Sequence, residues 1–504
     1  MNQCARTFIL TGLVVGILLA LHFLPPLSVG DTKLRRVNVL SDVLPEEMKG
    51  HDALDFVPAM PQVPLPVAAV ATADSTVPPA GKTAAAEHAV MADSALSALP
   101  AEADSSAAVV VARPVTIDTA HTTTPILDYS QGQPGGMARF YSLLAQARAM
   151  ERPVRVAYYG DSFIEGDIFT ADLRTLLQDE FGGNGVGWVD CGSEVYGFRQ
   201  TVSHAFSGLT EYEVVKRPFS TASQGIAQRY FTAQEGARIT LKGTRTRRHT
   251  ARWDRAIFYL RTEDGLRLRT TVNGDTTIVD TIGGAQHLQT VVHDGGYDQA
   301  DSLLRTRSMT SVSYVLTDIT PGTLLYGIAL EPRQGVVVDN FSMRGSAGYT
   351  LAQIPAATLA QFAAARPYDL IVLHYGLNVA NSQQGNYSSY AKNMGKAIEH
   401  LRQAFPQAAI LVVSVPDRDQ RTDAGLHTMR GVEQLVAYQQ FMASEHGVAF
   451  FNLFEAMGGR ESMMALVDRG LANKDYTHIN FAGGKHLARL LFEGMMAGYH
   501  GCGY

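Results

Sequence analysis

The sequence predicts a three-layer α/β/α protein with a parallel sheet, interrupted by an inserted all-β domain of jelly-roll type. Apolar strand-like runs alternate with helical stretches of about 10 to 15 residues in two parts of the chain, 136–200 and 336–504, a pattern typical of parallel sheets covered on both faces. Between them, residues 201–335 contain short alternating segments broken by turn dipeptides, with little helical period. That pattern is typical of a sandwich or jelly roll.

The α/β elements follow one another in a regular order. Helical spacing at 137–150 precedes a buried strand at 154–159 and a second helix at 168–181. After the insertion, strands are expected at 368–375, 409–415 and 448–453, and the helices that follow them at 390–405, 432–446 and 482–496. Within the insertion, we expect strands at 237–241, 256–260, 270–275 and 324–330.

The first 28 residues predict a membrane anchor. Residues 8–24 are almost wholly apolar and can just span a bilayer, and no small-x-small cleavage site follows, so an uncleaved signal anchor is favoured over a removed signal peptide. Lys33, Arg35 and Arg36 outnumber Arg6, so the flanking charge does not favour an outward carboxyl end. We still expect that orientation because long domains translocate largely regardless of charge. The predicted location is the inner membrane, with the folded part facing the periplasm.

Composition limits the other interpretations. Residues 29–130 are rich in Ala, Pro, Ser and Thr and predict a disordered linker. The net charge of −6 over 504 residues argues against nucleic acid as a partner. Cys4, Cys191 and Cys502 are too few for a disulfide framework. A Cys191–Cys502 bridge and two free thiols both remain open, and the sequence does not predict an oligomeric state.

Four short fragments carry the chemistry. A serine hydroxyl at a strand end needs a nearby base to take its proton. His478 is the candidate base for Ser162, and Asp475, three residues before the histidine, is placed to accept a hydrogen bond from its other ring nitrogen. Asn480 is expected to cap the helix that follows. The fragments are Gly160-Asp161-Ser162, Arg344-Gly345-Ser346, Gly376-Leu377-Asn378 and Asp475-Tyr476-Thr477-His478.

The same fragments offer donors for an oxyanion. Attack on an ester carbonyl builds negative charge on oxygen, which the backbone N–H groups of Ser162 and Gly345 and the side-chain amide of Asn378 are expected to stabilise. Glycine at 345 lets the backbone approach the substrate. Each fragment alone is ordinary turn sequence, but their joint occurrence, mostly at predicted strand ends, predicts a site.

With these motifs, the chain resembles the SGNH (GDSL-like) hydrolase superfamily, whose four named residues correspond to Ser162, Gly345, Asn378 and His478. The insertion between the serine and glycine blocks makes it most similar to bacterial peptidoglycan O-acetylesterases, in which the insertion resembles a carbohydrate-binding module. The resemblance implies an O-acetylated glycan substrate and neither a metal nor an organic cofactor. Phe163, after the nucleophile, departs from the small or polar residue of many relatives.

Three hypotheses follow. The first is a membrane-anchored esterase that removes O-acetyl groups from an envelope glycan such as peptidoglycan or exopolysaccharide. The second is an O-acetyltransferase that uses the same triad, and the third is a non-catalytic carbohydrate-binding envelope protein.

Several other residues are interpreted structurally. We expect His374, Trp253, Tyr259 and Tyr326 in the core, and Glu165 and Asp167 as first-turn helix acids. Asp417 and Asp419 are expected in a solvated loop.

Overall fold

The computed structural model describes residues 28–29, 32–33, 124–295, 308–383 and 385–504, and their contacts divide the chain into units 1–58 and 59–504. In the first unit, the described residues form the paired strands β1 (Ser28–Val29) and β2 (Thr32–Lys33). The predicted membrane segment and most of the predicted linker lie outside the described residues. Within those residues, none of the helices has the length and apolar character needed to cross a membrane.

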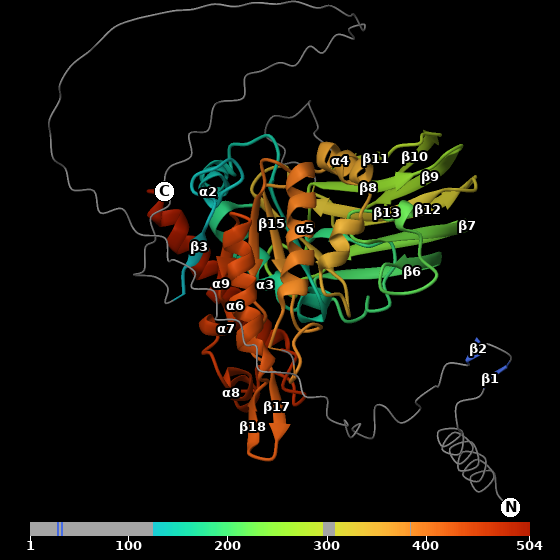
Figure 1. The fold of residues 1–504 in the computed structure, drawn as a ribbon. Helices are drawn as coiled ribbons and strands as arrows, with labels where there is room; N and C mark the ends of the chain where they lie inside the picture. Colours follow the sequence, from blue (N-terminus) through green and yellow to red (C-terminus); the bar gives the residue numbers. More distant parts are fainter. Residues whose placement is uncertain (1–27, 30–31, 34–123, 296–307, 384) are drawn as a thin grey trace, which may run out of the picture. The chain divides into compact units, whose positions relative to one another are not determined.

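A six-stranded sheet forms the centre of the α/β part of the second unit (Figure 1). Its order is β14-β4-β15-β16-β19-β3, and all neighbours are parallel except β3, which pairs antiparallel with β19. The chain reverses its direction of strand addition at β4, because β14 lies on one side of it and β15 on the other. The strands are β3 (Ile126–Asp128), β4 (Val154–Gly160), β14 (Val336–Ser342), β15 (Leu370–His374), β16 (Ala409–Val413) and β19 (Ala449–Phe451).

Helices complete the three predicted layers. Helices α2 and α3 both contact α9, and α5 contacts α4 and α6. Among the described residues, the α helices are α2 (Met137–Gln146), α3 (Thr170–Phe181), α4 (Ala356–Ala365), α5 (Ser388–Ala404), α6 (Gly431–Glu445), α7 (Leu453–Ala456), α8 (Ser462–Asp468) and α9 (Phe481–Gly501). Shorter elements are the 3₁₀ helices η1 (Ser162–Asp167), η2 (Thr221–Ser223) and η3 (Tyr349–Gln353) and the hairpin β17 (Asp419–Thr422) and β18 (Gly425–Thr428).

A second, nine-stranded antiparallel sheet lies between β4 and β14 in the sequence, which confirms the inserted all-β domain (Figure 1). The path β10-β9-β12-β7-β13-β8-β11 is extended by β5 on β13 and β6 on β7. The strands are β5 (Gly187–Val189), β6 (Val202–Glu213), β7 (Arg229–Gly243), β8 (Arg255–Arg261), β9 (Gly265–Val272), β10 (Thr276–Gly283), β11 (Gln289–Asp294), β12 (Ser311–Thr317) and β13 (Leu324–Glu331).

Two strands lie outside the domain boundaries that the sequence predicted for their sheets. Strand β3 falls within the stretch assigned to the linker, and it forms because its backbone completes the edge of the parallel sheet on β19. Strand β5 lies before residue 201 and pairs with β13 of the inserted sheet. The other limits of the domains stay predictions.

A buried ion network joins the two sheets. The Arg366 guanidinium, fully buried, lies 2.6 Å from the carboxylate of Glu331 in β13 and 2.7 Å from that of Asp339 in β14. Arg155 of β4 also binds Glu331, at 2.8 Å. Burial alone would raise the pKa of Glu331, but the charges of Arg366 and Arg155 outweigh it and hold that pKa well below its usual range. Because both sheets supply partners, neither can shift without breaking buried ion pairs.

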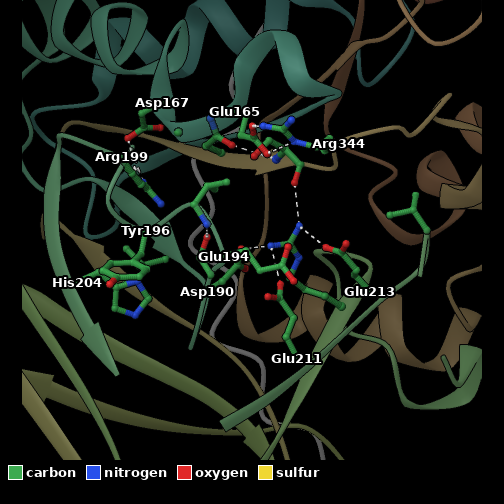
Figure 2. A pocket seen from close by; sticks show the side chains of 18 of the residues that line it. Glu165, Asp167, Asp190, Glu194, Tyr196, Arg199, His204, Glu211, Glu213 and Arg344 are labelled. Carbon is green, nitrogen blue, oxygen red and sulfur yellow. Dashed lines mark hydrogen bonds and ion pairs between the residues drawn. The ribbon is translucent and has the colours of Figure 1, made fainter. Parts of the chain in front are cut away.

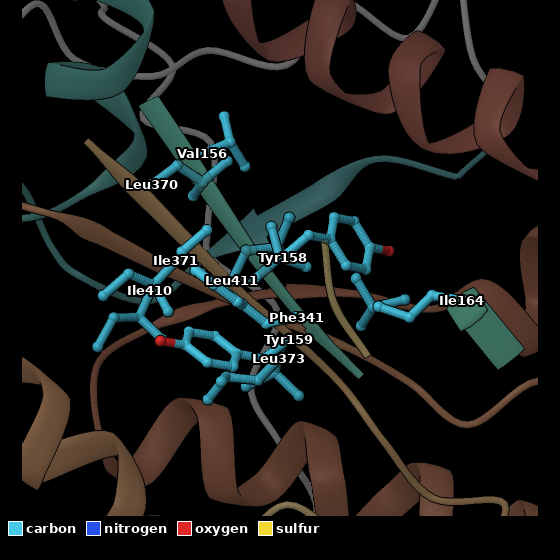
Figure 3. Packing of buried hydrophobic residues seen from close by; sticks show 14 of the residues in the cluster. Val156, Tyr158, Tyr159, Ile164, Phe341, Leu370, Ile371, Leu373, Ile410 and Leu411 are labelled. Atoms are coloured by element: carbon cyan, nitrogen blue, oxygen red, sulfur yellow. The ribbon is translucent and has the colours of Figure 1, made fainter. Parts of the chain in front are cut away.

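The central strands are apolar on both sides. In β4, Tyr158 and Tyr159 are both buried and, as successive strand residues, point to opposite faces of the sheet (Figure 3). Tyr158 packs on Phe169 and Tyr159 on Phe341. Burial on both faces explains why the β4 sequence reads as a continuous apolar run. The expected core positions of Trp253, Tyr259 and Tyr326 are confirmed.

Candidate active site

The nucleophile candidate stands at the carboxyl end of β4. The turn is tight, because a Cβ on Gly160 would lie 2.9 Å from the carbonyl oxygen of His374. Asp161 caps the following 3₁₀ helix by accepting a hydrogen bond from the N–H of Phe163 at 3.0 Å. Ser162 therefore begins η1 and remains partly exposed, while its neighbours Asp161 and Phe163 are buried.

Strand register brings the fragments together. Gly160 of β4 pairs with Ser342 of β14 and with His374 of β15. The turns carrying Gly345 and Asn378 follow directly after these two partner strands. All three turns thus meet at one edge of the sheet, at the point where strand addition reverses, which is where ligands bind in open α/β sheets.

Ser162, His478 and Asp475 form a hydrogen-bonded chain. The Ser162 Oγ lies 3.0 Å from His478 Nε2, and His478 Nδ1 lies 2.8 Å from Asp475 Oδ2. An ionised carboxylate only accepts hydrogen bonds, so Nδ1 carries the proton and Nε2 is left to accept from the serine hydroxyl. This is the geometry that general-base activation of a serine requires.

Hydrogen bonds within the loop hold the acid and the base in place. Asp475 Oδ1 accepts hydrogen bonds from the N–H groups of Thr477 and His478, each at 3.0 Å. A bridge between Ala472 and Ile479 closes the loop at its base. The Asn480 side chain caps α9 by accepting from the N–H groups of Ala482 and Gly483, which confirms the predicted cap.

The acid of the triad is ionised and open to water. Partial burial would raise the pKa of Asp475, but hydrogen bonds from the His478 backbone and ring and from Thr477 lower it overall. The side chains of Asp475 and His478 keep 48% and 39% of their surface exposed. Water therefore has access to the base.

The Gly345 turn presents a free donor. Ser346 N–H bonds to the Met343 carbonyl at 3.0 Å, closing a four-residue turn in which Gly345 has φ +77°. A positive φ at this turn position favours glycine. Among the described residues, the N–H groups of Ser162 and Gly345 have no intramolecular hydrogen-bond partner. Two unpaired N–H groups on turns at one sheet edge suit an oxyanion hole.

One of the two N–H donors of the Asn378 side chain is already used within the protein. The side-chain amide donates to the Ser346 carbonyl at 3.0 Å, which ties the Asn378 turn to the Gly345 turn. The amide has a second N–H, so it keeps one donor for substrate. A further link is the ion pair between Arg344, next to Gly345, and Glu165 of η1.

Asp161 is a site residue that sequence reasoning missed. The residue is 1% exposed, and burial raises the pKa of its carboxyl group to about 6, although N–H groups of Phe163, Leu377 and Gly376 and the charge of His478 act to lower it. Its Oδ2 completes no hydrogen bond. The carboxyl thus lies between the Ser162 turn and the Gly376–Leu377 turn. Its place within the Gly-Asp-Ser fragment was the one available signal.

His374 is a hydrogen-bonded core histidine, as expected, with its Nδ1 3.0 Å from the Tyr158 hydroxyl. Burial lowers its pKa to about 3, so it stays neutral. Phe163 is buried and packs edge-on against His374.

Three acids, Asp167, Asp417 and Asp419, lie elsewhere than predicted. Asp167 is no first-turn helix acid: it has φ +67°, is fully buried and pairs with Arg174 and Arg199. Glu165 does lie in the first turn of η1, but its own backbone is non-helical and its carboxylate pairs with Arg344. Asp417 and Asp419 are also buried, because they accept hydrogen bonds from N–H groups at the start of α8.

Cys191 and Cys502 are both buried, and no disulfide joins them. No group of three or more His, Cys, Asp and Glu side chains suited to a metal ion occurs in the part of the chain that the structure describes.

Comparisons with known proteins agree with this geometry. Residues 322–485 match the GDSL-like Lipase/Acylhydrolase family. The match includes Gly345, Asn378, Asp475 and His478, whereas Ser162 lies before the insertion. No curated protein matches the chain.

The fold is shared with a solved structure. The structure of a peptidoglycan O-acetylesterase is 22% identical, with a TM-score of 0.58, covering 74% of this chain and 98% of that one. A salicylyl-acyltransferase from a tetracycline biosynthetic pathway is 12% identical over 59% of this chain and 98% of that one, with a TM-score of 0.26. A Corynascus carbohydrate esterase family 2 enzyme with a carbohydrate-binding domain is 10% identical over 59% of this chain and 100% of that one, with a TM-score of 0.26. The last two superpose too poorly to bear on function.

The structure has the three-layer α/β/α fold of an SGNH hydrolase, with an inserted all-β domain. The match of residues 322–485 to the GDSL-like lipase/acylhydrolase family supports an esterase of the SGNH type.

Proposed function

We propose that the protein removes acetyl groups from an O-acetylated envelope glycan, such as peptidoglycan or exopolysaccharide, through an acetyl-Ser162 intermediate. The observation that carries the catalytic part is the chain of 3.0 Å and 2.8 Å contacts from Ser162 through His478 to Asp475. The shared fold with a peptidoglycan O-acetylesterase supports the choice of acyl group and glycan.

In the first half-reaction, the Ser162 Oγ attacks the acetyl carbonyl carbon while His478 Nε2 takes the hydroxyl proton. The carbonyl oxygen receives the electron pair and is stabilised by the N–H groups of Ser162 and Gly345 and by the Asn378 amide. Collapse of this intermediate breaks the bond to the sugar oxygen, which takes the proton from His478. Asp475 holds the imidazole in orientation and stabilises its charge.

In the second half-reaction, water attacks the acetyl-serine carbonyl and gives a proton to His478. The Ser162 oxygen then leaves with that proton, and acetate is released. The half-exposed side chains of His478 and Asp475 support water as the acceptor, which favours hydrolysis over an O-acetyltransferase. The assembled triad also disfavours a purely carbohydrate-binding role.

Acetate release from an O-acetylated glycan by the full chain tests the proposal. Ser162→Ala should abolish release, whereas Ser223→Ala, in the exposed helix η2, should leave it unchanged. Adding deacetylated oligosaccharide separates the alternatives, because a transferase would form acetylated oligosaccharide at the expense of acetate. Binding of glycan without turnover of any acetyl ester would favour the non-catalytic alternative.

The location remains part of the proposal. The apolar segment 8–24 supports anchoring in the inner membrane, and a glycan substrate calls for a catalytic domain on the periplasmic side. Alkaline extraction of membranes and protease access from the periplasmic side test both statements. Release of the full chain by alkali would contradict the anchor.

A further inference from the structure

A pocket of about 440 Å³ opens beside the Gly345 turn, where the two sheets meet. Its wall on the hydrolase side comes from η1 and from the turn after β14, including Arg344 and Gly345. The opposite wall comes from β6, β7 and the segment after β5 (Figure 2). The inserted sheet thus shapes the space next to the candidate oxyanion hole.

An exposed aromatic ring lines this pocket. Tyr196 keeps 50% of its surface exposed, a large fraction for an aromatic side chain in a folded domain. Its ring packs nearly perpendicular to those of His204 and Phe206, at 6.5 Å and 5.4 Å, which holds its orientation. A rigid, half-exposed aromatic side chain offers apolar surface that a ligand can cover at little entropic cost.

One carboxyl group on the inserted-sheet side of the pocket, that of Glu211, has fewer hydrogen-bond and ion-pair partners than its neighbours. The Arg229 guanidinium lies 2.7 Å from Asp190, 3.3 Å from Glu211 and 3.7 Å from Glu213 (Figure 2). Asp190 also receives the Trp188 indole N–H, and Glu213 also pairs with Lys216. Among the described residues, Glu211 forms an ion pair only with Arg229, at the longer distance of 3.3 Å. Burial, with help from Asp190 and Glu213, outweighs the charge of Arg229 and raises the pKa of Glu211 to about 7.

The charges of the lining select against anions. Six carboxylates and four cationic side chains face the pocket, so negative charge is in excess. His204 adds no charge, because burial lowers its pKa to about 4. A ligand that brings hydroxyl donors and an apolar ring face matches both the carboxyl-rich wall and the exposed tyrosine.

We propose that this pocket binds a neutral sugar ring adjacent to the acetylated one, with Tyr196 packing on the ring face and Glu211 accepting hydrogen bonds from ring hydroxyls. This inference rests on the proposed function. The inserted domain then contributes directly to substrate selection at the active site.

The test compares two substrates on the full chain: 4-nitrophenyl acetate, which has no second sugar, and a partially acetylated neutral oligosaccharide. Tyr196→Ala and Glu211→Gln should each raise the KM for the oligosaccharide about tenfold and leave kcat/KM for 4-nitrophenyl acetate within about twofold. Tyr196→Phe keeps the ring and should keep the KM of the native protein. Val279→Ala and Glu263→Gln change exposed side chains of the same inserted domain, outside the pocket, and serve as matched controls.

An unchanged KM for the oligosaccharide would overturn the inference. So would an equal loss on both substrates, which indicates a structural role, or a preference for a carboxylated oligosaccharide over the neutral one. Failure of the native protein to turn over 4-nitrophenyl acetate would instead refute the proposed esterase chemistry, so the two failures are distinguishable.

Discussion

The buried carboxyl group of Asp161 should make the enzyme less stable as the pH rises. Its pKa is about 6 in the folded protein against an ordinary 3.8. The folded state therefore holds a proton that the unfolded chain releases, and stability present below pH 3.8 is lost as the pH rises through about 6. A difference of about two pKa units corresponds to about 3 kcal/mol at neutral pH, of which about 2 kcal/mol is lost between pH 4.5 and 7.5.

Asp161→Asn removes this titration. Urea unfolding of the full chain, followed by tryptophan fluorescence, gives the free energy of unfolding of variant and native protein at pH 4.5 and 7.5. The variant-minus-native difference should move by about 2 kcal/mol in favour of the variant at the higher pH. Comparing two pH values cancels any constant effect of the amide.

Ser162→Ala retains Asp161 and is the control, since its difference from the native protein should not move in this way. If the Asp161→Asn difference is the same at both pH values, or moves in the opposite direction, the burial argument is wrong.

Three further substitutions probe the site and its support. Asp475→Asn should lower kcat for an acetyl ester by about 10³-fold or more with little change in KM, because the carboxylate orients His478 without touching substrate; an unchanged kcat would remove Asp475 from the triad. Gly345→Ala should lower kcat by about 10- to 100-fold with an unchanged circular dichroism spectrum, because a side chain strains a residue at φ +77° and displaces its N–H. Full activity there would contradict the oxyanion role. Arg366→Met removes the ion-pair partner of the buried Asp339 carboxylate, while Glu331 keeps Arg155 and Arg255. The variant should therefore lower the free energy of unfolding by about 3–5 kcal/mol in urea titrations; a loss near zero would show that the two sheets do not depend on this network.

The sequence was most informative where chemistry and backbone coincide. Ser162, Gly345 and Asn378 each follow a strand, and parallel strand ends meet at one edge, so their convergence could be expected. Asp475 and His478 are three residues apart, so one loop presents both. The alternation of strand and helix predicted the layers for the same reason, because it depends on local periodicity.

The sequence was least informative where a side chain's surroundings come from distant segments. Asp167 resembles a helix-start acid, but a kink with positive φ at Gly166 and Asp167 breaks the helix, and Arg199 reaches the carboxylate from another segment. The sequence around Asp417 is typical of a loop, but α8, which lies more than forty residues further along the chain, packs over it and buries its carboxylate. The contribution of Tyr196 and Glu211 to one pocket likewise depends on how the inserted sheet packs against the hydrolase domain.

The most direct test of the proposed chemistry is to locate the acyl-enzyme. Full-length protein is incubated with an activated acetyl ester, quenched in acid, digested and examined by mass spectrometry. We predict one acetyl group on Ser162, absent in Ser162→Ala and longer-lived in His478→Ala, because deacylation needs the imidazole. Acetylation of a different residue, or undiminished turnover in Ser162→Ala, would contradict the account.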